Sequence, residues 1–389
     1  MRDILPALQQ WWHDGVTVGL ATVVGVRRSA PRQPGAAMAV AGDEAVGSVS
    51  GGCVEGAVYI LSQQVAASGV PEKVSYGISD DQAFAVGLTC GGEIDLFVEP
   101  FDRERVPFFD ELARAIGGEA PAALATIVDG PPGEVRVGAK ILVTPATPDA
   151  GPQAEPTSGV RGTLGSEGLD VAVIADARGM LEQGLTGTRH YGSHGQRRLD
   201  DVEVFIESFA PRPRMLVFGA IDFAAAVARI GTFLGYRVTV CDAREVFATP
   251  RRFPEADEVI VEWPHRYLQR TSVDRRTVIC VLTHDPKFDV PLLEVALATD
   301  AGYIGAMGSR RTHDDRLARL REAGISEAQI ARLSSPIGLD LGARTAEETA
   351  VSVAAELIQQ RWGGTGKPLS AVDGVIHGAP PARGAAARP

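Results

Sequence analysis

The sequence predicts an α/β protein in which an N-terminal α+β domain precedes a C-terminal Rossmann-like domain with a doubly wound parallel sheet. Three observations support this fold class. After residue 214, short apolar strands alternate with helical patterns, which is the rhythm of βαβ units. Before residue 210, most β-forming segments follow one another without a long helix between them. The proline-rich segment 210–214 separates the two regions and is stiff enough to mark a domain boundary.

The N-terminal domain is placed at residues 1–209. It opens with a predicted helix, because Leu5, Leu8 and Trp12 have helical spacing. Residues 145–158 are rich in proline and glycine and are predicted to form a flexible surface insertion. The other predicted elements are strands at 16–26, 36–40, 44–49, 94–99, 122–129, 170–174 and 202–208, and helices at 54–65 and 111–116.

The Rossmann-like domain is placed at residues 210–373. Thr345 and Glu348 have the spacing of a capping box and predict a helix start. Residues 374–389 are predicted to be a disordered tail. The remaining elements are predicted strands at 215–218, 237–241, 258–261, 277–282 and 303–306, and helices at 224–234, 291–298, 309–323 and 346–361.

The bulk composition excludes several classes of protein. The formal net charge of −11 argues against sequence-independent nucleic-acid binding, which needs a basic surface. No apolar run is long enough for a transmembrane helix, and the first residues lack a signal-peptide pattern. The four cysteines are too few and too far apart for a disulfide scaffold, and none forms a Cys-x-x-Cys pair. We therefore expect a cytoplasmic protein with no membrane association.

The most informative motif is the run Ser50, Gly51, Gly52 and Cys53, which precedes a helical pattern. Glycines allow positive φ angles and close approach of the backbone to a ligand. A thiol near a helix N-terminus experiences positive potential, which favours the thiolate that attacks sulfur and binds soft metals. The alternative is a tight turn followed by a small buried cysteine. A second glycine-flanked cysteine, which could converge on the same ligand, lies in the run Cys90-Gly91-Gly92.

The turn after the first strand of the Rossmann-like domain contains part of a dinucleotide-binding fingerprint. Gly219 is present, but Ile221 stands where the second glycine admits a pyrophosphate, and Asp222 adds a negative charge there. Asp242 ends the next strand, where a carboxylate binds ribose in dinucleotide-binding proteins. Ordinary NAD(P) binding is therefore disfavoured. The alternative is a Rossmann fold without its usual ligand.

Two further motifs follow later strands of the same sheet. Thr283, His284 and Asp285 come after the fourth strand, at the edge where ligands bind in open α/β sheets. His284 could act as a base, a metal ligand or a hydrogen-bond donor. The turn Gly308-Ser309-Arg310 opens a helix and could bind an anion. The alternatives are that the polar groups of the first motif only satisfy the loop backbone, and that Ser309 only caps its helix.

Together these motifs resemble the XdhC/CoxI family, the accessory proteins of xanthine dehydrogenase and related molybdenum hydroxylases. The resemblance extends over nearly the whole chain, but this sequence departs from the family at Ile221 and Asp222, where the family usually has glycine and histidine. The segments that carry it are Gly35–Met38, Gly47–Glu55, Cys90–Gly92, Asp242–Arg244, Arg252–Pro254, Thr283–Asp285, Tyr303–Gly305, Gly308–Arg311, Pro336–Asp340 and Glu347–Ser352.

The resemblance implies a cytoplasmic chaperone without turnover of its own. Such proteins bind the molybdenum cofactor, hold it while a terminal oxo ligand is replaced by sulfido, and pass it to the apo-hydroxylase. A cysteine desulfurase would supply the sulfur. Cys53 then becomes the candidate for contacting molybdenum or relaying sulfur, two roles that suit a soft thiolate.

Two other functions stay open at this point. The Rossmann-like domain alone would suit an NAD(P)-dependent oxidoreductase, although Ile221 and Asp222 count against it. The same domain could instead be an interaction scaffold in a docking protein without enzymatic activity. A homodimer is expected because two-fold homodimers are the commonest oligomers.

Overall fold

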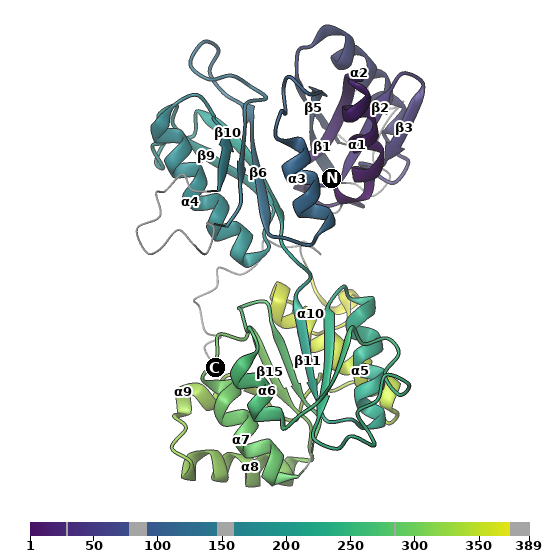
Figure 1. Cartoon of the computed structure of the whole chain (residues 1–389), viewed down its shortest axis with the longest axis vertical. Helices are drawn as coiled ribbons and strands as arrows, with labels where there is room; N and C mark the ends of the chain where they lie inside the picture. The colour runs from purple at the N-terminus through teal and green to yellow at the C-terminus, as the bar shows by residue number, and fades with distance from the viewer. Residues whose placement is uncertain (29, 78–91, 146–158, 284, 374–389) are drawn as a thin grey trace. The chain divides into compact units, whose positions relative to one another are not determined.

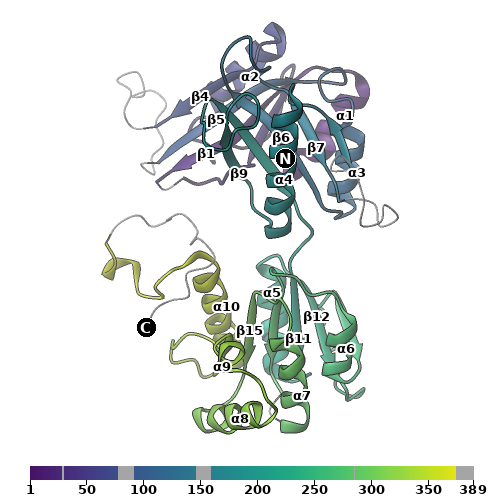
Figure 2. The same cartoon turned by 90° about the vertical axis from the view of Figure 1, so that its left-hand side faces the viewer.

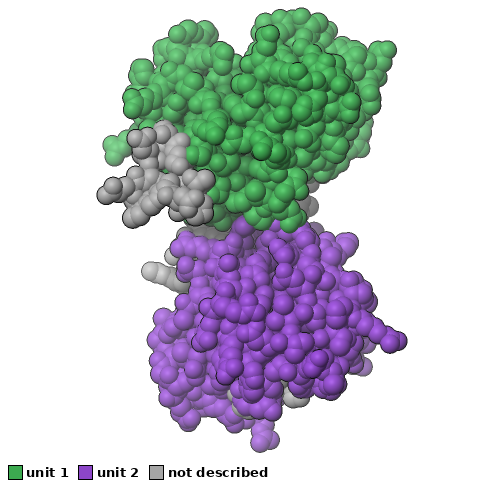
Figure 3. Space-filling model, in the orientation of Figure 1, with its two compact units in different colours: residues 1–211, 374–377 green, residues 212–373, 378–389 purple. Residues whose placement is uncertain are grey.

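The computed structural model describes residues 1–28, 30–77, 92–145, 159–283 and 285–373. The described residues form two compact units, Met1–Pro211 and Arg212–Asp373, which Figure 3 shows in different colours. The predicted insertion at 145–158 lies outside the described residues except for Pro145, and the predicted tail at 374–389 lies outside them entirely. Among the described residues, no helix combines the length and apolar character needed to cross a bilayer.

The first half of unit 1 is a five-stranded antiparallel sheet with the strand order β3-β2-β1-β5-β4. Helix α2 packs on β1 and β5, and its apolar side contributes Val58 and Val65 to a core cluster beneath the sheet. The elements of this half, labelled in Figure 1 or Figure 2, are α1 (Leu5–Asp14), β1 (Val18–Arg27), β2 (Ala37–Ala41), β3 (Glu44–Gly47), α2 (Glu55–Ser68), β4 (Glu72–Tyr76) and β5 (Glu93–Phe101).

The second half of unit 1 repeats this topology, with the strand order β8-β7-β6-β10-β9. Helix α4 packs on β6 and β10 as α2 packs on the first sheet. The elements are α3 (Phe109–Gly117), β6 (Ala122–Asp129), β7 (Lys140–Val143), β8 (Val160–Gly162), α4 (Glu167–Gln183), β9 (Gly187–Tyr191) and β10 (Val202–Phe209).

The two halves are copies of one unit, as their sequences and strand register show. Strand β1 contains Leu20-Ala-Thr-Val-Val24 and β6 contains Leu124-Ala-Thr-Ile-Val128, whereas β5 ends in Phe97-Val-Glu-Pro-Phe101 and β10 in Phe205-Ile-Glu-Ser-Phe209. Thr22 pairs with Phe97 in the first sheet, and Thr126 pairs with Phe205 in the second. Unit 1 is therefore an internal duplication, which the sequence analysis missed.

Equivalent residues of the two copies meet in the interior of unit 1. Val24 and Phe97 form one cluster with Val128 and Phe205, so each copy packs through the same surface. Two equivalent glutamates are also buried here, and each meets one ammonium group. Glu99 lies 2.6 Å from Lys140 Nζ, and Glu207 lies 2.9 Å from the α-amino group of Met1. Burial raises the pKa of the Glu99 carboxyl, and the Lys140 charge opposes that rise.

Unit 2 is a six-stranded parallel sheet with the strand order β13-β12-β11-β14-β15-β16, which confirms the predicted doubly wound Rossmann-like fold. Side chains of successive strand residues alternate between two core clusters, one under α5 and α10 and the other under α6, α7 and α8. Figure 2 draws α10 and α6 on opposite sides of the strands of this unit. The elements are β11 (Arg214–Phe218), α5 (Asp222–Phe233), β12 (Arg237–Asp242), β13 (Glu258–Val261), α6 (Pro264–Arg270), β14 (Val278–Val281), α7 (Pro286–Leu297), β15 (Tyr303–Ala306), α8 (Arg310–Glu322), α9 (Glu327–Ile330), β16 (Leu333–Ser334) and α10 (Ala346–Trp362).

Most predicted elements are present, including the capping box, in which Thr345 and Glu348 bond each other's backbone N–H groups at the start of α10. The strand predicted at 170–174 is wrong, because these residues lie inside α4. The β-branched residues Val171, Val173 and Ile174 suit a strand locally, but Ser166 caps a helix of 17 residues there. The missed strands include β4, β7 and β9, which are short or half exposed and lack a clear alternation.

Candidate functional site

The Ser50–Cys53 motif forms the loop between β3 and α2, and one carboxylate holds this loop together. Glu55, in the first turn of α2, accepts hydrogen bonds from Ser48 Oγ at 2.6 Å and from Ser50 N at 2.9 Å. It also accepts bonds from the Ser50 hydroxyl, from Gly52 N at 2.8 Å and from Val54 N at 3.2 Å. Because these donors come from the loop itself, the loop is a pre-formed structure rather than an open connection.

These contacts change the ionisation of Glu55. Partial burial acts to raise the pKa of this carboxyl, but the hydrogen bonds from Ser48 and Ser50 outweigh it and lower the pKa to about 2. The side chain is therefore a carboxylate throughout the physiological range. The sequence analysis quoted Glu55 as part of the family motif but gave it no role. Its position seven residues after Ser48, in the first turn of a predicted helix, was the available signal.

The two glycines shape the surface beside Cys53. Gly51 and Gly52 have φ angles of +75° and +114°, which favour glycine. Among the residues that the structure describes, a Cβ atom at Gly52 would meet no atom within 4 Å, and one at Gly51 would meet Pro31 alone, at 3.8 Å. A ligand can therefore approach the backbone directly at these positions. The thiol of Cys53 is half-buried at the edge of this open surface, against the core beneath α2.

A cavity of about 410 Å³ is lined in part by Pro31, the residue that a Cβ at Gly51 would meet. Its basic side chains are Arg2 and Arg32, and its acidic ones are Asp3 and Glu207. The Arg2 guanidinium donates to Ala210 O at 2.7 Å. Arg32, which lines this cavity, is the chain neighbour of Pro31, the residue that lies near Gly51.

The second copy contains a counterpart of the loop without its thiol. In the stretch that contains this loop and the helix after it, equivalent residues of the two copies differ by 115 in number. The stretch begins at Gly47 and Gly162 and ends at Gly69 and Gly184. Thr163 and Asp170 reproduce the contact of Ser48 with Glu55, with a hydroxyl-to-carboxylate distance of 2.7 Å. The position that corresponds to Cys53 is Gly168, inside the first turn of α4. A Cβ there would lie 2.3 Å from His194 O, so this position excludes a side chain.

The other cysteines differ in their surroundings. Cys90 and Gly91 lie outside the described residues, so their predicted convergence with Cys53 stays a prediction. Cys241 and Cys280 are buried in β12 and β14, and burial raises the pKa of each thiol to about 12. These two thiols are core residues.

In unit 2, Gly219 and Asp242 lie at the carboxyl ends of adjacent strands. Gly219 has φ +111°, and a Cβ there would lie 3.0 Å from Thr283 N, so the turns after β11 and β14 touch. Both oxygens of Asp242 have partners within the protein: Ala220 N donates to Oδ2 at 2.7 Å, and Arg244 Nε donates to Oδ1 at 2.9 Å. Burial opposes ionisation of Asp242, but these bonds lower its pKa. Ribose binding by Asp242 stays a prediction, and a ribose would compete with Arg244.

The later motifs surround a buried ion pair. Thr283 donates its hydroxyl to Asp289, which lies 3.1 Å from Arg316, and both charged side chains are almost fully buried. Arg316 also donates to Met307 O at 2.7 Å, next to Gly308. This network joins the ends of β14 and β15 to α7 and α8. Neither Asp289 nor Arg316 was singled out from the sequence for this role.

The remaining predicted residues have mixed positions. His284 lies outside the described residues. Asp285 caps α7 by accepting from Lys287 N, and Ser309 caps α8 by accepting from Thr312 N. Arg310 is exposed in the first turn of α8. Two groups of predicted site residues thus exist, one at the β3–α2 loop of unit 1 and one at the strand ends of unit 2. In the described part of the chain, no cluster of three or more His, Cys, Asp or Glu residues could hold a metal ion.

Two family models match the chain. The model described as the XdhC and CoxI family matches residues 11–77 and 115–192, and the model described as the XdhC Rossmann domain matches residues 215–357. The two stretches of the first match end at residues 77 and 192, which differ by 115 positions, as Gly69 and Gly184 at the ends of α2 and α4 do.

Relatives of known name are similar over most of their length. A protein of Bacillus subtilis (strain 168) that is named as a probable subunit of xanthine dehydrogenase is 26% identical over 347 residues, covering 88% of this chain and 92% of that protein. The molybdenum cofactor insertion chaperone PaoD of Escherichia coli (strain K12) is 26% identical over 361 residues, covering 92% of this chain and 88% of that protein.

The fold is also similar to a solved structure. A crystal structure described as a xanthine dehydrogenase from Bacillus halodurans superposes with a TM-score of 0.64 at 22% sequence identity, covering 92% of this chain and 95% of that one. This likeness concerns the fold alone.

Proposed function

Because this chain belongs to the XdhC and CoxI family, we propose that it binds the molybdenum cofactor as cargo and delivers it to an apo-hydroxylase of the xanthine dehydrogenase type. The observation that carries the proposal is the β3–α2 loop, which holds a single thiol, Cys53, beside an open glycine surface. The name of the PaoD relative supports the class of cargo, and the name of the Bacillus subtilis relative supports the class of partner.

In this proposal the loop contributes a fixed soft ligand. The carboxylate of Glu55 and the hydroxyl of Ser50 accept the amide hydrogens of Gly52, Cys53 and Val54, so these N–H groups are not available to an anion. The loop therefore positions the Cys53 sulfur and leaves the phosphate of the pterin to another part of the surface. We assign that role to Arg32, in the cavity that Pro31 lines in part.

We also propose that Cys53 can carry sulfur for the cofactor. A persulfide on a cysteine desulfurase would transfer its terminal sulfur to the Cys53 thiolate and release the desulfurase thiolate. This exchange transfers one sulfur atom and needs no added oxidant or reductant. Exposure of the loop over Gly51 and Gly52 gives a second protein access to the thiol.

The test is retention of the cofactor after gel filtration under anaerobic conditions, measured as molybdenum and pterin per chain. We expect near-stoichiometric retention by the wild-type protein and background retention by Cys53→Ala. The Cys53→Ser variant keeps the shape of the side chain but not its soft sulfur, and it should fail in the same way. Retention by Cys53→Ser would mean that Cys53 acts through packing, and retention by both variants would overturn the role of the thiol.

Two further variants extend the same experiment. Arg32→Ala should weaken retention without abolishing it, because the thiol remains. Cys90→Ala tests whether the second glycine-flanked cysteine contacts the same cargo.

Light scattering on the gel-filtration peak reports whether the protein is the homodimer that we propose. A pull-down with the apo-hydroxylase should require loaded cofactor. A cofactor-independent pull-down would favour a docking protein instead.

A further inference from the structure

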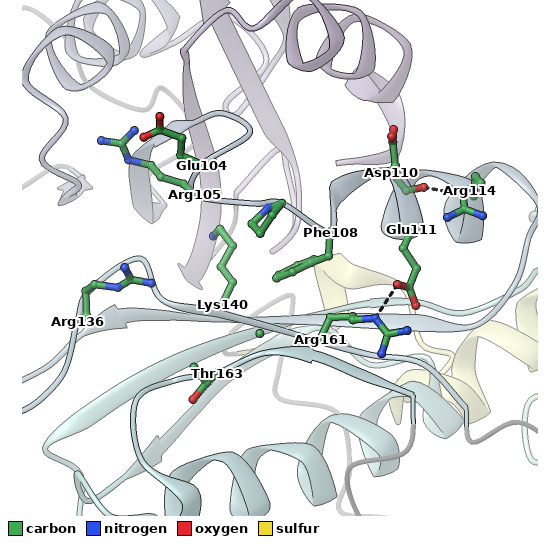
Figure 4. Close-up of a pocket in the computed structure, with 12 residues that line it drawn as sticks. Glu104, Arg105, Phe108, Asp110, Glu111, Arg114, Arg136, Lys140, Arg161 and Thr163 are labelled. Atoms are coloured by element: carbon green, nitrogen blue, oxygen red, sulfur yellow. Dashed lines mark hydrogen bonds and ion pairs between the residues drawn. The ribbon is translucent and has the colours of Figure 1, made fainter. Parts of the chain in front are cut away.

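We propose that a second cavity in unit 1, distinct from the loop of Cys53, binds the phosphate group of a small phosphorylated molecule. The cavity has a volume of about 580 Å³, within the range of small-molecule sites. It lies in the second copy, between the segment leading into α3 and the strands β7 and β8 (Figure 4). Its basic residues are Arg105, Arg114, Arg136, Lys140 and Arg161.

The charge of the cavity is opposite to that of the chain. Five basic side chains line it against three acidic ones, whereas acidic residues outnumber basic ones in the whole sequence, with a net charge of −11. Such a concentration of guanidinium groups attracts an anion and can bind it with charge-assisted hydrogen bonds.

Not all of these cations are neutralised by neighbouring carboxylates. Arg161 pairs with Glu111 at 3.1 Å, and Arg105 pairs with Asp102. Arg136 makes no ion pair with any residue that the structure describes, and Figure 4 shows it at the same end of the cavity as Arg105. Lys140 uses two of its three N–H donors, on Glu99 at 2.6 Å and Thr126 at 2.9 Å. We therefore place the phosphate among Arg136, Arg105 and Lys140.

The rest of the ligand would lie on Phe108, which forms an apolar wall beside these cations (Figure 4). Its ring packs closely on the backbone of Gly162, since a Cβ there would lie 2.9 Å from Phe108 Cε1. Gly162 also has φ +85°, which favours glycine. The wall is thus fixed before a ligand arrives, which lowers the entropic cost of binding.

The comparison between the two copies of unit 1 supports a specialised site. Lys140 of β7 lies opposite Thr126 of β6 in the second sheet, and Ala37 of β2 lies opposite Thr22 of β1 in the first sheet. Ala37 is therefore the residue equivalent to Lys140. The residue equivalent to Phe108 is Ile4. These two residues differ by 104 in number, as do the equivalent residues Leu20 and Leu124. The lysine side chain and the aromatic ring therefore have no counterpart at these two positions of the first copy, where the ammonium beside the equivalent glutamate is the α-amino group of Met1.

The experiment is titration calorimetry at low ionic strength with three probes: inorganic phosphate, ribose 5-phosphate and ribose. We expect saturable binding of both phosphates and none of ribose. Arg136→Ala should raise the dissociation constant about tenfold, the effect of losing one hydrogen bond between charged groups. Arg136→Lys, which keeps the positive charge, should raise the dissociation constant by a smaller factor. Arg198→Ala removes an exposed arginine elsewhere in unit 1 and should match the wild type within about twofold.

Three outcomes would overturn the proposal: no saturable phosphate binding, binding that Arg136→Ala leaves unchanged, or equal weakening by Arg136→Ala and Arg198→Ala, which would indicate a general charge effect. The proposal does not depend on the proposed function, because neither Cys53 nor the molybdenum cofactor enters the experiment. Retention of the cofactor and binding of phosphate can therefore fail independently.

Discussion

At the scale of single residues, Glu55 organises the site more than any residue of the glycine-cysteine motif. Its carboxylate bonds groups on Ser48, Ser50, Gly52 and Val54, so it fixes the backbone on both sides of the two glycines. A neutral amide of the same shape would accept fewer bonds and would place an NH2 group against a donor. The thiol of Cys53 would then sit on a less ordered loop.

We expect Glu55→Gln to lower the free energy of unfolding by about 1–2 kcal/mol at neutral pH, a modest value because solvent screens the loop. The pKa of Glu55 is depressed to about 2 from an ordinary value of 4.5. Its stabilisation is therefore complete above about pH 5 and is lost as the pH falls towards 2. Thermal unfolding across this range should show the wild type and the variant converging in acid.

The matched control is Glu44→Gln, which changes an exposed glutamate at the start of β3. It should leave the melting temperature nearly unchanged at every pH. A constant difference between wild type and Glu55→Gln down to pH 2 would show that the charge of Glu55 is not what holds the loop.

At the scale of elements, helix α4 shows why local propensity led to a wrong prediction of a strand at 170–174. Val171, Val173 and Ile174 favour a strand, but a cap at Ser166, a left-handed Gly184 at the far end and buried positions at helical spacing all favour a helix. The local preference of these residues for a strand contributes less free energy than the burial of the apolar face of the whole helix. The longer apolar strands β1, β5, β6 and β10 were predicted correctly because both their composition and their length are typical of buried strands.

Helix α4 contains two glycines with contrasting surroundings. A Cβ at Gly168 would lie 2.3 Å from His194 O, whereas a Cβ at Gly179 would meet no atom of the described residues within 4 Å. We expect Gly168→Ala to destabilise unit 1 by about 1–3 kcal/mol, because backbone must move. Gly179→Ala should stabilise it by about 0.5–1 kcal/mol through the lower entropy of the unfolded chain.

Urea unfolding of both alanine variants beside the wild type gives the two changes directly. Equal effects of the two substitutions would contradict the close approach of α4 to the turn at His194. That approach explains why the second copy has a glycine, Gly168, at the position equivalent to Cys53. It therefore also explains why the loop of the first copy carries a thiol and the equivalent loop of the second copy does not.

At the scale of the whole molecule, the sequence contained a signal that was not used. The strings in β1 and β6 and in β5 and β10 are nearly identical, and they alone indicate a duplication. The fold class and the Ser50–Cys53 loop followed from local patterns. Glu55, the Asp289–Arg316 pair and the cluster of arginines around Phe108 did not, because their partners lie on segments that only the folded chain brings together.

The duplication makes a symmetric prediction about the core between the copies. Phe97 and Phe205 are equivalent, are both buried and share one cluster. Phe97→Ala and Phe205→Ala should each cost about 3–5 kcal/mol of unfolding free energy. The double variant should cost less than the sum, since the two rings share a cavity, with a coupling of about 0.5–3 kcal/mol in denaturant unfolding. Strict additivity would place the rings in separate environments.

The shared register of β1 with β5 and of β6 with β10 also has a kinetic consequence. During synthesis, β2 emerges soon after β1, but the second partner of β1, strand β5, emerges about seventy residues later, and β6 and β10 are separated by a similar interval. Since Thr22 and Thr126 each face a phenylalanine followed by Val-Glu or Ile-Glu, β1 and β6 each accept either β5 or β10 with the same pattern of side chains. Correct pairing therefore depends on the order in which the strands appear, and a chain refolded from full length loses that order and is prone to strand exchange.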